Sequence, residues 1–178
     1  VELILSDRKV DLLAEGFDLA VRIGEPEDSS LILRRLACVH RSVCASPEYL
    51  KRRGVPQTPE ELSAHDCLLY AYHSVPTSWR FRSPDREAVV DVKGTLVSNH
   101  AEMLVEAACH GLGLVFCPLF FTAPSLRDGR LVQVLPAWQV PLSISAVFPN
   151  ARHVPAKVRL LIDFLVAQFA SPPWADCT

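Results

Sequence analysis

The stretch from Gly94 to Pro118 constrains the fold most, because its pattern changes from strand to helix and back to strand within one short segment. Residues 95–97 have strand propensity. Asn99 is predicted to cap the helix that follows, since Glu102 three residues later completes a capping box. A helix that begins beside the end of a strand presents free backbone N–H groups, and open α/β sheets bind ligands at such points.

Apolar residues at helical spacing define the buried face of this predicted helix: Ala101, Leu104, Val105, Ala108 and Leu112. Gly111 is predicted to end the helix in the left-handed conformation. The run from Leu114 to Cys117 is entirely apolar, which is typical of a strand covered on both faces. Two interpretations of Asn99 stay open: a helix cap only, or a cap that also contacts a ligand.

The composition of the 178-residue chain excludes several classes of protein. Its net charge of −2 gives no indication of a basic surface, so we do not expect this chain to bind DNA by itself. None of its six cysteines forms a C-x-x-C motif and most lie in apolar runs, which indicates buried free thiols in a reducing compartment. No apolar run reaches the roughly 18 residues of a membrane span.

The N-terminal region is predicted to form a parallel βαβ unit. Residues 1–5 have the pattern of a strand, Ser6 or Asp7 can cap a helix through Ala14, and residues 17–23 alternate as a half-buried strand. The sequence begins without a methionine or a signal peptide, in the middle of an expected strand. We therefore expect the natural chain to be longer and this sequence to be its C-terminal part.

The rest of the sequence alternates between strands and helices, as in mixed sheets flanked by helices. The expected elements are strands at 31–36, 39–45, 67–72, 79–82, 88–92, 131–135 and 142–148, and helices after Ser46, Thr58, Pro118 and Pro155. We predict an α/β fold with two lobes, in which residues 1–45 and 135–170 form the first lobe and residues 46–134 the second. Residues 171–178 form a tail, and a ligand is expected between the lobes.

Several segments together resemble the effector-binding domain of LysR-type transcriptional regulators. The resemblance covers residues 1–170 and lies in SDRKVDLLAEGFDLAVRIG (6–24), CASPEYL (44–50), WRF (79–81), the helix after Asn99 with GLG (111–113), GRLV (129–132) and 157–165. It implies a two-lobed fold like that of type 2 periplasmic binding proteins.

The resemblance also implies which parts are absent here. Members of this family carry an N-terminal winged helix-turn-helix and a linker helix, and a first strand and helix that open the effector domain; this sequence has none of these. The implied protein is a cytoplasmic regulator that senses a small organic effector and assembles as a homodimer or homotetramer. It contacts DNA only through the missing N-terminal domain.

The implied ligand-binding residues come from both lobes: Arg22, Ile23, Gly24, Ala45, Ser46, Trp79, Asn99 and Pro118. A structural role remains the alternative for several of them. Ser46 can act only as a helix cap, Arg22 can pair with an acidic neighbour, and Trp79 can pack in the core. In the implied dimer, residues 1–14 meet residues 95–110 of the partner.

Two other functions stay open, a transport-type solute-binding protein and a small cytosolic enzyme; the upstream sequence would distinguish them. No catalytic, cofactor or metal-ligand motif is evident. The G-x-G at 111–113 follows a helix and precedes a strand, the reverse of a dinucleotide-binding order. We therefore expect no cofactor and no metal site.

Overall fold

A computed structural model describes residues 1–6, 8, 10–24, 31–73, 75–149, 154–172 and 174. The chain divides into two compact units: unit 1 contains residues 1–8 and 40–140, and unit 2 contains residues 9–39 and 141–176. The helices and strands, in chain order, are β1 (Ala20–Ile23), β2 (Leu31–Ala45), α1 (Pro47–Arg53), the 3-10 helix η1 (Pro59–Ala64), β3 (Asp66–Tyr70), β4 (Ser78–Arg82), β5 (Glu87–Asp91), β6 (Lys93–Ser98), α2 (Ala101–Cys109), β7 (Leu114–Pro118), α3 (Leu119–Arg127), β8 (Val132–Val134), β9 (Val140–Pro149) and α4 (Ala156–Gln168).

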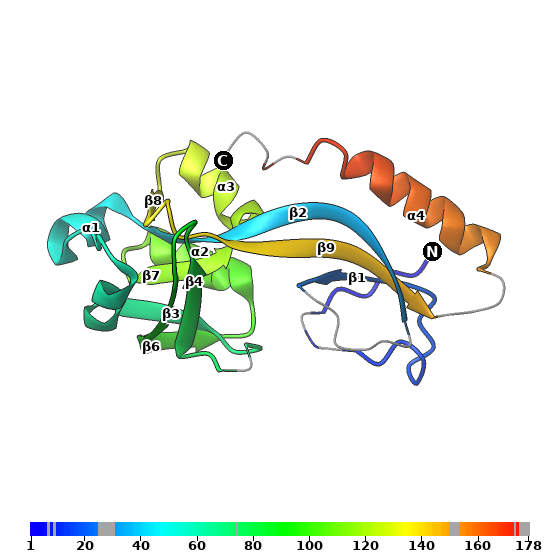
Figure 1. Ribbon diagram of the computed structural model, residues 1–178, viewed down its shortest axis with the longest axis horizontal. Coiled ribbons are helices and arrows are strands. Elements are labelled where there is room, and N and C mark those ends of the chain that lie inside the picture. Colours follow the sequence, from blue (N-terminus) through cyan, green and yellow to red (C-terminus); the bar gives the residue numbers. More distant parts are fainter. Residues whose placement is uncertain are drawn as a thin grey trace. The chain divides into compact units, whose positions relative to one another are not determined.

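The sheet of unit 1 is mixed, as the sequence predicts. Its strand β3 runs parallel to β6 on one side and to β7 on the other. The strand β7 pairs antiparallel with the end of β2, which also pairs with β8. Figure 1 shows these strands as the centre of unit 1. The strands predicted at 79–82 and 88–92 are confirmed as β4 and β5, which pair antiparallel as a separate two-stranded sheet.

Both faces of this sheet are covered, which explains why β7 is almost fully apolar. On one face a core of buried residues includes Val43, Tyr49, Trp79 and Phe116. The other face packs against α2 and α3 through a second cluster that includes Leu104. A strand between two apolar layers needs no polar face.

The start of α1 follows the predicted cap. The Oγ of Ser46 accepts a hydrogen bond from the Tyr49 N–H at 3.2 Å, and Pro47 occupies the first turn. Gly54 ends the helix with φ of 87°, a conformation that costs glycine little. Thr58 before η1 makes no side-chain cap bond, although Glu61 accepts a hydrogen bond from the Gln57 N–H at 3.0 Å.

The predicted cap of α2 is wrong by one residue. His100, not Asn99, is the N-cap of α2, and its side chain makes no capping hydrogen bond. The Ser98 Oγ instead accepts a hydrogen bond from the His100 N–H at 3.1 Å, which fixes the turn before the helix. Gly111 has the predicted left-handed conformation, with φ of 75°. Leu112 follows this turn rather than continuing the helix, and it is exposed instead of buried.

Unit 2 contains β1, β9, the first part of β2 and the helix α4. The strand β1 pairs antiparallel with β9, with Val21 opposite Ala146. The core of this unit is formed by Ala146, Phe148, Val158 and Ile162. The last helix therefore covers β9 through Val158 and Ile162.

The N-terminal βαβ prediction is wrong. Residues 1–5 form no strand and Leu3, Ile4 and Leu5 are exposed, while residues 12–16 form turns rather than a helix; Asp7 lies outside the described residues. A strand forms only where a neighbour satisfies its backbone N–H and C=O groups, and no described residue pairs with residues 1–5. The expected dimer contacts from residues 1–14 therefore lose the strand and helix on which they depended. In the same region, the two strands predicted at 31–36 and 39–45 are one continuous strand, β2.

Within the described residues, no helix has both the length and the apolar character needed to cross a membrane.

Candidate functional site

The parallel strands of unit 1 end at one edge of its sheet. β3, β6 and β7 reach this edge at Tyr70, Ser98 and Pro118 respectively. In open α/β sheets, ligands bind outside the carboxyl ends of the strands, because loops and helix starts there leave polar groups unpaired. This edge is therefore where a site in unit 1 is expected.

Arg41 brings a positive charge to this edge. It lies on β2 directly opposite Pro118, so its backbone is held at the end of β7. Its guanidinium carbon lies 5.7 Å from the centre of the Phe116 ring, and its Nε is buried without a hydrogen-bond partner. No carboxylate of the described residues forms an ion pair with Arg41. Burial lowers the pKa of Arg41, but an arginine side chain stays protonated in proteins.

Aromatic and polar side chains surround this cation. The ring of Tyr70 lies 6.0 Å from that of Tyr72 and 5.6 Å from that of His73, both edge-on. The Asn99 Nδ2 donates a hydrogen bond to the Tyr72 hydroxyl at 3.4 Å. We call Arg41, Tyr70, Tyr72, His73 and Asn99 the carboxyl-edge cluster.

His73 is uncharged at neutral pH. Burial, and to a smaller extent the positive charge of Arg41, lowers the pKa of His73 to about 4. Arg41 therefore provides the positive charge of the cluster, beside an imidazole that can donate or accept a hydrogen bond.

This arrangement suits a ligand with negative charge. A partly buried guanidinium without a counter-ion is costly, and a bound anion would offset that cost through charge-assisted hydrogen bonds. Among the described residues of the cluster, no nucleophile is hydrogen-bonded to a base.

The predicted site residues of unit 1 separate into two groups. Asn99 and Pro118 lie at the carboxyl edge. Ala45 and Ser46 are buried, and Ser46 caps α1. Trp79 is only 4% exposed and packs against Phe116 at 5.2 Å, which is the core role that the sequence left open.

The predicted site residues of unit 2 lie at the end of β1. The Arg22 Nη2 donates a hydrogen bond to the Val10 carbonyl at 2.5 Å, so its head group is held by backbone rather than by an acidic neighbour. Ile23 is about half exposed, at 48%. The Gly24 N–H donates to the Ser143 carbonyl at 2.8 Å, and its φ of 101° favours glycine.

The sequence analysis missed Arg41, Tyr70, Tyr72 and His73. Two signals could have indicated them. Arg41 comes directly before the buried end of a strand, where a charge is costly. Tyr70, Tyr72 and His73 lie at or just beyond the end of a buried parallel strand.

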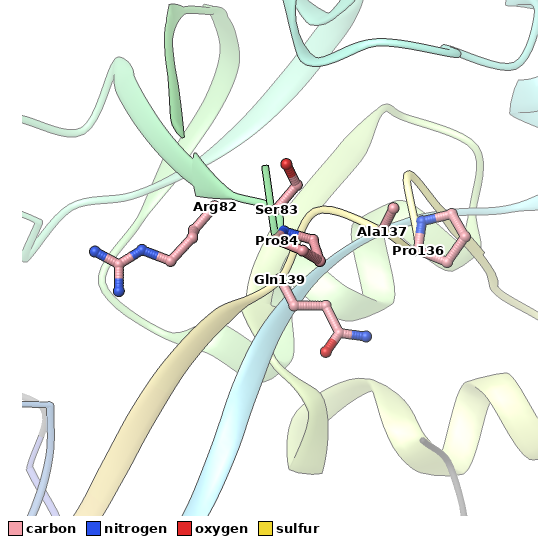
Figure 2. Close-up of a pocket in the computed structure, with 6 residues that line it drawn as sticks. All are labelled: Arg82, Ser83, Pro84, Pro136, Ala137 and Gln139. Carbon is pink, nitrogen blue, oxygen red and sulfur yellow. The ribbon is translucent and has the colours of Figure 1, made fainter. Parts of the chain in front are cut away.

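A hollow lies elsewhere in unit 1, between the β4–β5 turn and the connection from β8 to β9 (Figure 2). It has a volume of about 440 Å³ and is lined by Arg82, Ser83, Pro84, Pro136, Ala137 and Gln139. Its guanidinium is already compensated, because the Arg82 Nε donates to the Glu87 carboxylate at 2.9 Å. This hollow therefore lacks the unpaired charge that distinguishes the carboxyl-edge cluster.

The part of the chain that the structure describes contains no group of three or more histidine, cysteine or acidic side chains placed to hold a metal ion.

The sequence of the chain matches one family along nearly all its length. The family described as "LysR substrate binding domain" matches residues 1–170. The chain belongs to this family. The resemblance stated from the sequence is thereby confirmed, as is the α/β fold with mixed sheets and helices.

Relatives of known sequence are transcriptional regulators rather than enzymes. An HTH-type transcriptional regulator of Haemophilus influenzae is 38% identical over 89% of this chain and 55% of its own length. The HTH-type transcriptional regulator DmlR of Escherichia coli is 36% identical over 93% of this chain and 54% of its own length. The chain thus spans about half the length of these relatives.

Solved structures agree with the fold. The full-length Vibrio cholerae virulence activator AphB, a member of the LTTR protein family, superposes with a TM-score of 0.80 at 32% identity, covering 93% of this chain and 57% of AphB. The regulatory domain of CrgA from Neisseria meningitidis superposes with a TM-score of 0.75 at 28% identity, covering 88% of this chain and 78% of that domain.

Proposed function

We propose that this chain is the effector-sensing and oligomerisation module of a LysR-type bacterial transcription regulator. The observation that carries the proposal is an uncompensated cation, Arg41, at the carboxyl edge of a sheet in a chain of this family. Such a charge needs a partner, and a small organic effector supplies one. The relatives' names support the regulatory role, and they give no support to a transport protein or an enzyme.

The proposed assembly follows from the length of the relatives. Because the chain corresponds to about half of each, the rest of the protein would hold the helix-turn-helix that contacts DNA. We propose a homodimer or homotetramer that acts in the cytoplasm. The chain itself would contact the effector and other subunits, but not DNA.

The proposed mechanism is a shift between conformations. Arg41 lies on β2, a strand whose first part belongs to unit 2 and whose last part belongs to unit 1. An effector that binds Arg41 would act directly on this shared strand. It would favour the conformation that it binds more tightly, and only by that difference in affinity. The moving parts would be the two predicted lobes.

A thermal-shift screen tests this function. The whole chain is heated with a panel of small organic acids, aromatic compounds, amino acids and neutral sugars. A ligand present at a hundred times its dissociation constant stabilises the folded state by about 2.7 kcal/mol, which is a readable shift. An effector should also change expression of a reporter controlled by the full-length regulator. A regulator whose reporter responds to none of the compounds that bind the chain would contradict the proposed function.

A further inference from the structure

We propose that the effector is a small carboxylate, and that its carboxylate group binds the Arg41 guanidinium at the carboxyl-edge cluster. This inference rests on the proposed function and adds the chemical class of the effector and the residue that selects it. The arginines of unit 1 differ in whether their guanidinium groups have a partner.

Other arginines of unit 1 have partners for their head groups. Arg82 pairs with Glu87 at 2.5 Å, Arg86 lies 3.3 Å from Glu60, and Arg130 lies 3.2 Å from Glu106. Arg52 has no such carboxylate but donates a hydrogen bond to the Gly111 carbonyl at 2.8 Å. Among the described residues, the Arg41 guanidinium has neither an ion pair nor a hydrogen bond.

The surroundings of Arg41 make this difference informative. An exposed arginine without a partner is solvated by water and needs no explanation. Arg41 is partly buried, its Nε has no access to water, and one face of its guanidinium lies over the Phe116 ring. A cation–π contact stabilises the charge but does not replace the hydrogen bonds lost on burial. A bound anion would replace them.

The neighbouring groups favour a carboxylate that carries an organic body. The planar guanidinium matches a carboxylate through two parallel hydrogen bonds. Next to it, the rings of Tyr70 and His73 provide apolar surface, and the hydrogen-bonded pair Tyr72 and Asn99 provides polar atoms at the exposed end. Tyr72 is 49% exposed, so this end of the cluster is open to a ligand.

The test compares acids with their uncharged amides. The whole chain is titrated by calorimetry with succinate and phenylacetate, and with succinamide and phenylacetamide as isosteric neutral probes. At least one acid should bind, and its amide should bind at least tenfold more weakly. If the amides bind as well as the acids, or if neither acid binds, the carboxylate assignment is overturned. A neutral compound that still stabilises the chain would leave the proposed sensing function intact.

Two variants locate the interaction. Arg41→Gln should weaken binding of the acid at least tenfold and leave binding of the amide unchanged. Arg82→Gln removes a guanidinium that Glu87 already compensates, and it should bind the acid like the wild type. Equal affinity in Arg41→Gln and Arg82→Gln would overturn the assignment of Arg41. If Arg41→Gln does not fold, Arg41→Lys replaces it in the test. This variant keeps the positive charge but cannot form the bidentate hydrogen bond, so it should bind the acid more weakly than the wild type.

A spectroscopic readout separates charge pairing from a structural effect. Because the Arg41 charge contributes to the low pKa of His73, an anion bound to Arg41 should raise the pKa of His73 in an NMR titration. The corresponding amide should leave the pKa of His73 unchanged. An unchanged His73 titration with saturating acid would place the anion elsewhere and overturn the proposal.

Discussion

The Arg41 side chain, on β2 opposite the end of β7, places a permanent charge beside the Phe116 ring. Folding of the free chain therefore carries a desolvation cost that no described carboxylate offsets. A buried charge without a counter-charge marks a candidate binding site. An internal ion pair would explain Arg41 as a purely structural residue, but no described carboxylate forms one with it.

His73 should make the stability of the chain depend on pH. Its pKa is about 4 in the folded chain and about 6.5 when unfolded, so the unfolded state binds more protons between these values. The contribution of His73 is therefore complete above about pH 6.5 and is lost as the pH falls towards 4. The free energy of unfolding is measured with urea at pH 7.5 and at pH 4.5. Its decrease between these two pH values should be about 1–2 kcal/mol smaller in His73→Asn than in the wild type.

Two other histidines should also contribute to the pH dependence. His40 and His65, whose pKa values burial also lowers, keep some pH dependence in the variant. Identical losses of stability in the variant and the wild type would contradict the assigned environment of His73.

The cysteines should differ sharply in their reactivity. Burial raises the pKa of Cys44 to about 11 and that of Cys67 to about 12, and it also raises the pKa of Cys117. Since the thiolate is the reactive form, iodoacetamide at pH 8 should modify the exposed Cys38 and spare these three in the folded chain. Peptide mapping by mass spectrometry measures this. Modification of Cys117 as fast as Cys38 would contradict the described core.

At the scale of elements, the sequence predicted the caps, turns and helix faces that depend only on residues close together in the chain. The cap at Ser46, the turn at Gly111 and the buried face of α2 were predicted because each needs only residues a few positions apart. The strand at residues 1–5 failed because a strand depends on a distant neighbour. Arg41 was missed for the same reason: its environment comes from β2, β3 and β7, and only the folded sheet brings these together.

The cap of α1 should contribute measurably to the stability of unit 1. Ser46→Ala removes the hydrogen bond to the Tyr49 N–H and should lower the free energy of unfolding by about 1 kcal/mol. Thr58→Ala is the matched control, because Thr58 precedes η1 but makes no side-chain cap bond. Chemical denaturation of both variants measures the difference. Equal losses would show that the Ser46 hydroxyl does not act as a cap.

The packing of β3 against β7 should not tolerate a side chain at Gly113. A Cβ there would lie 2.4 Å from the Asp66 carbonyl oxygen, and a backbone atom cannot move without shifting a strand. A Cβ at Gly94 would lie 2.3 Å from a methyl group and 2.8 Å from the Cγ of the buried Leu69, so that side chain has to repack while the backbone stays in place. We expect Gly113→Ala to cost about 3 kcal/mol and Gly94→Ala about 1 kcal/mol. Thermal unfolding of the two variants measures the order, and the reverse order would contradict the β3–β7 geometry.

At the scale of the whole molecule, the two units share the strands β2 and β9. Each strand begins in one unit and ends in the other. A ligand that changes the end of β2 therefore acts on a segment common to both units. In a regulator, that connection would convert binding of a small molecule into a change in the attached DNA-binding parts.

Hydrogen–deuterium exchange with a bound acid tests the central claim most directly. Succinate or phenylacetate, whichever binds, should slow backbone amide exchange at residues 70–73, at residues 98–100 and around Arg41 on β2. Protection confined to the hollow lined by Arg82, Pro136 and Gln139, with no change at the carboxyl-edge cluster, would contradict it.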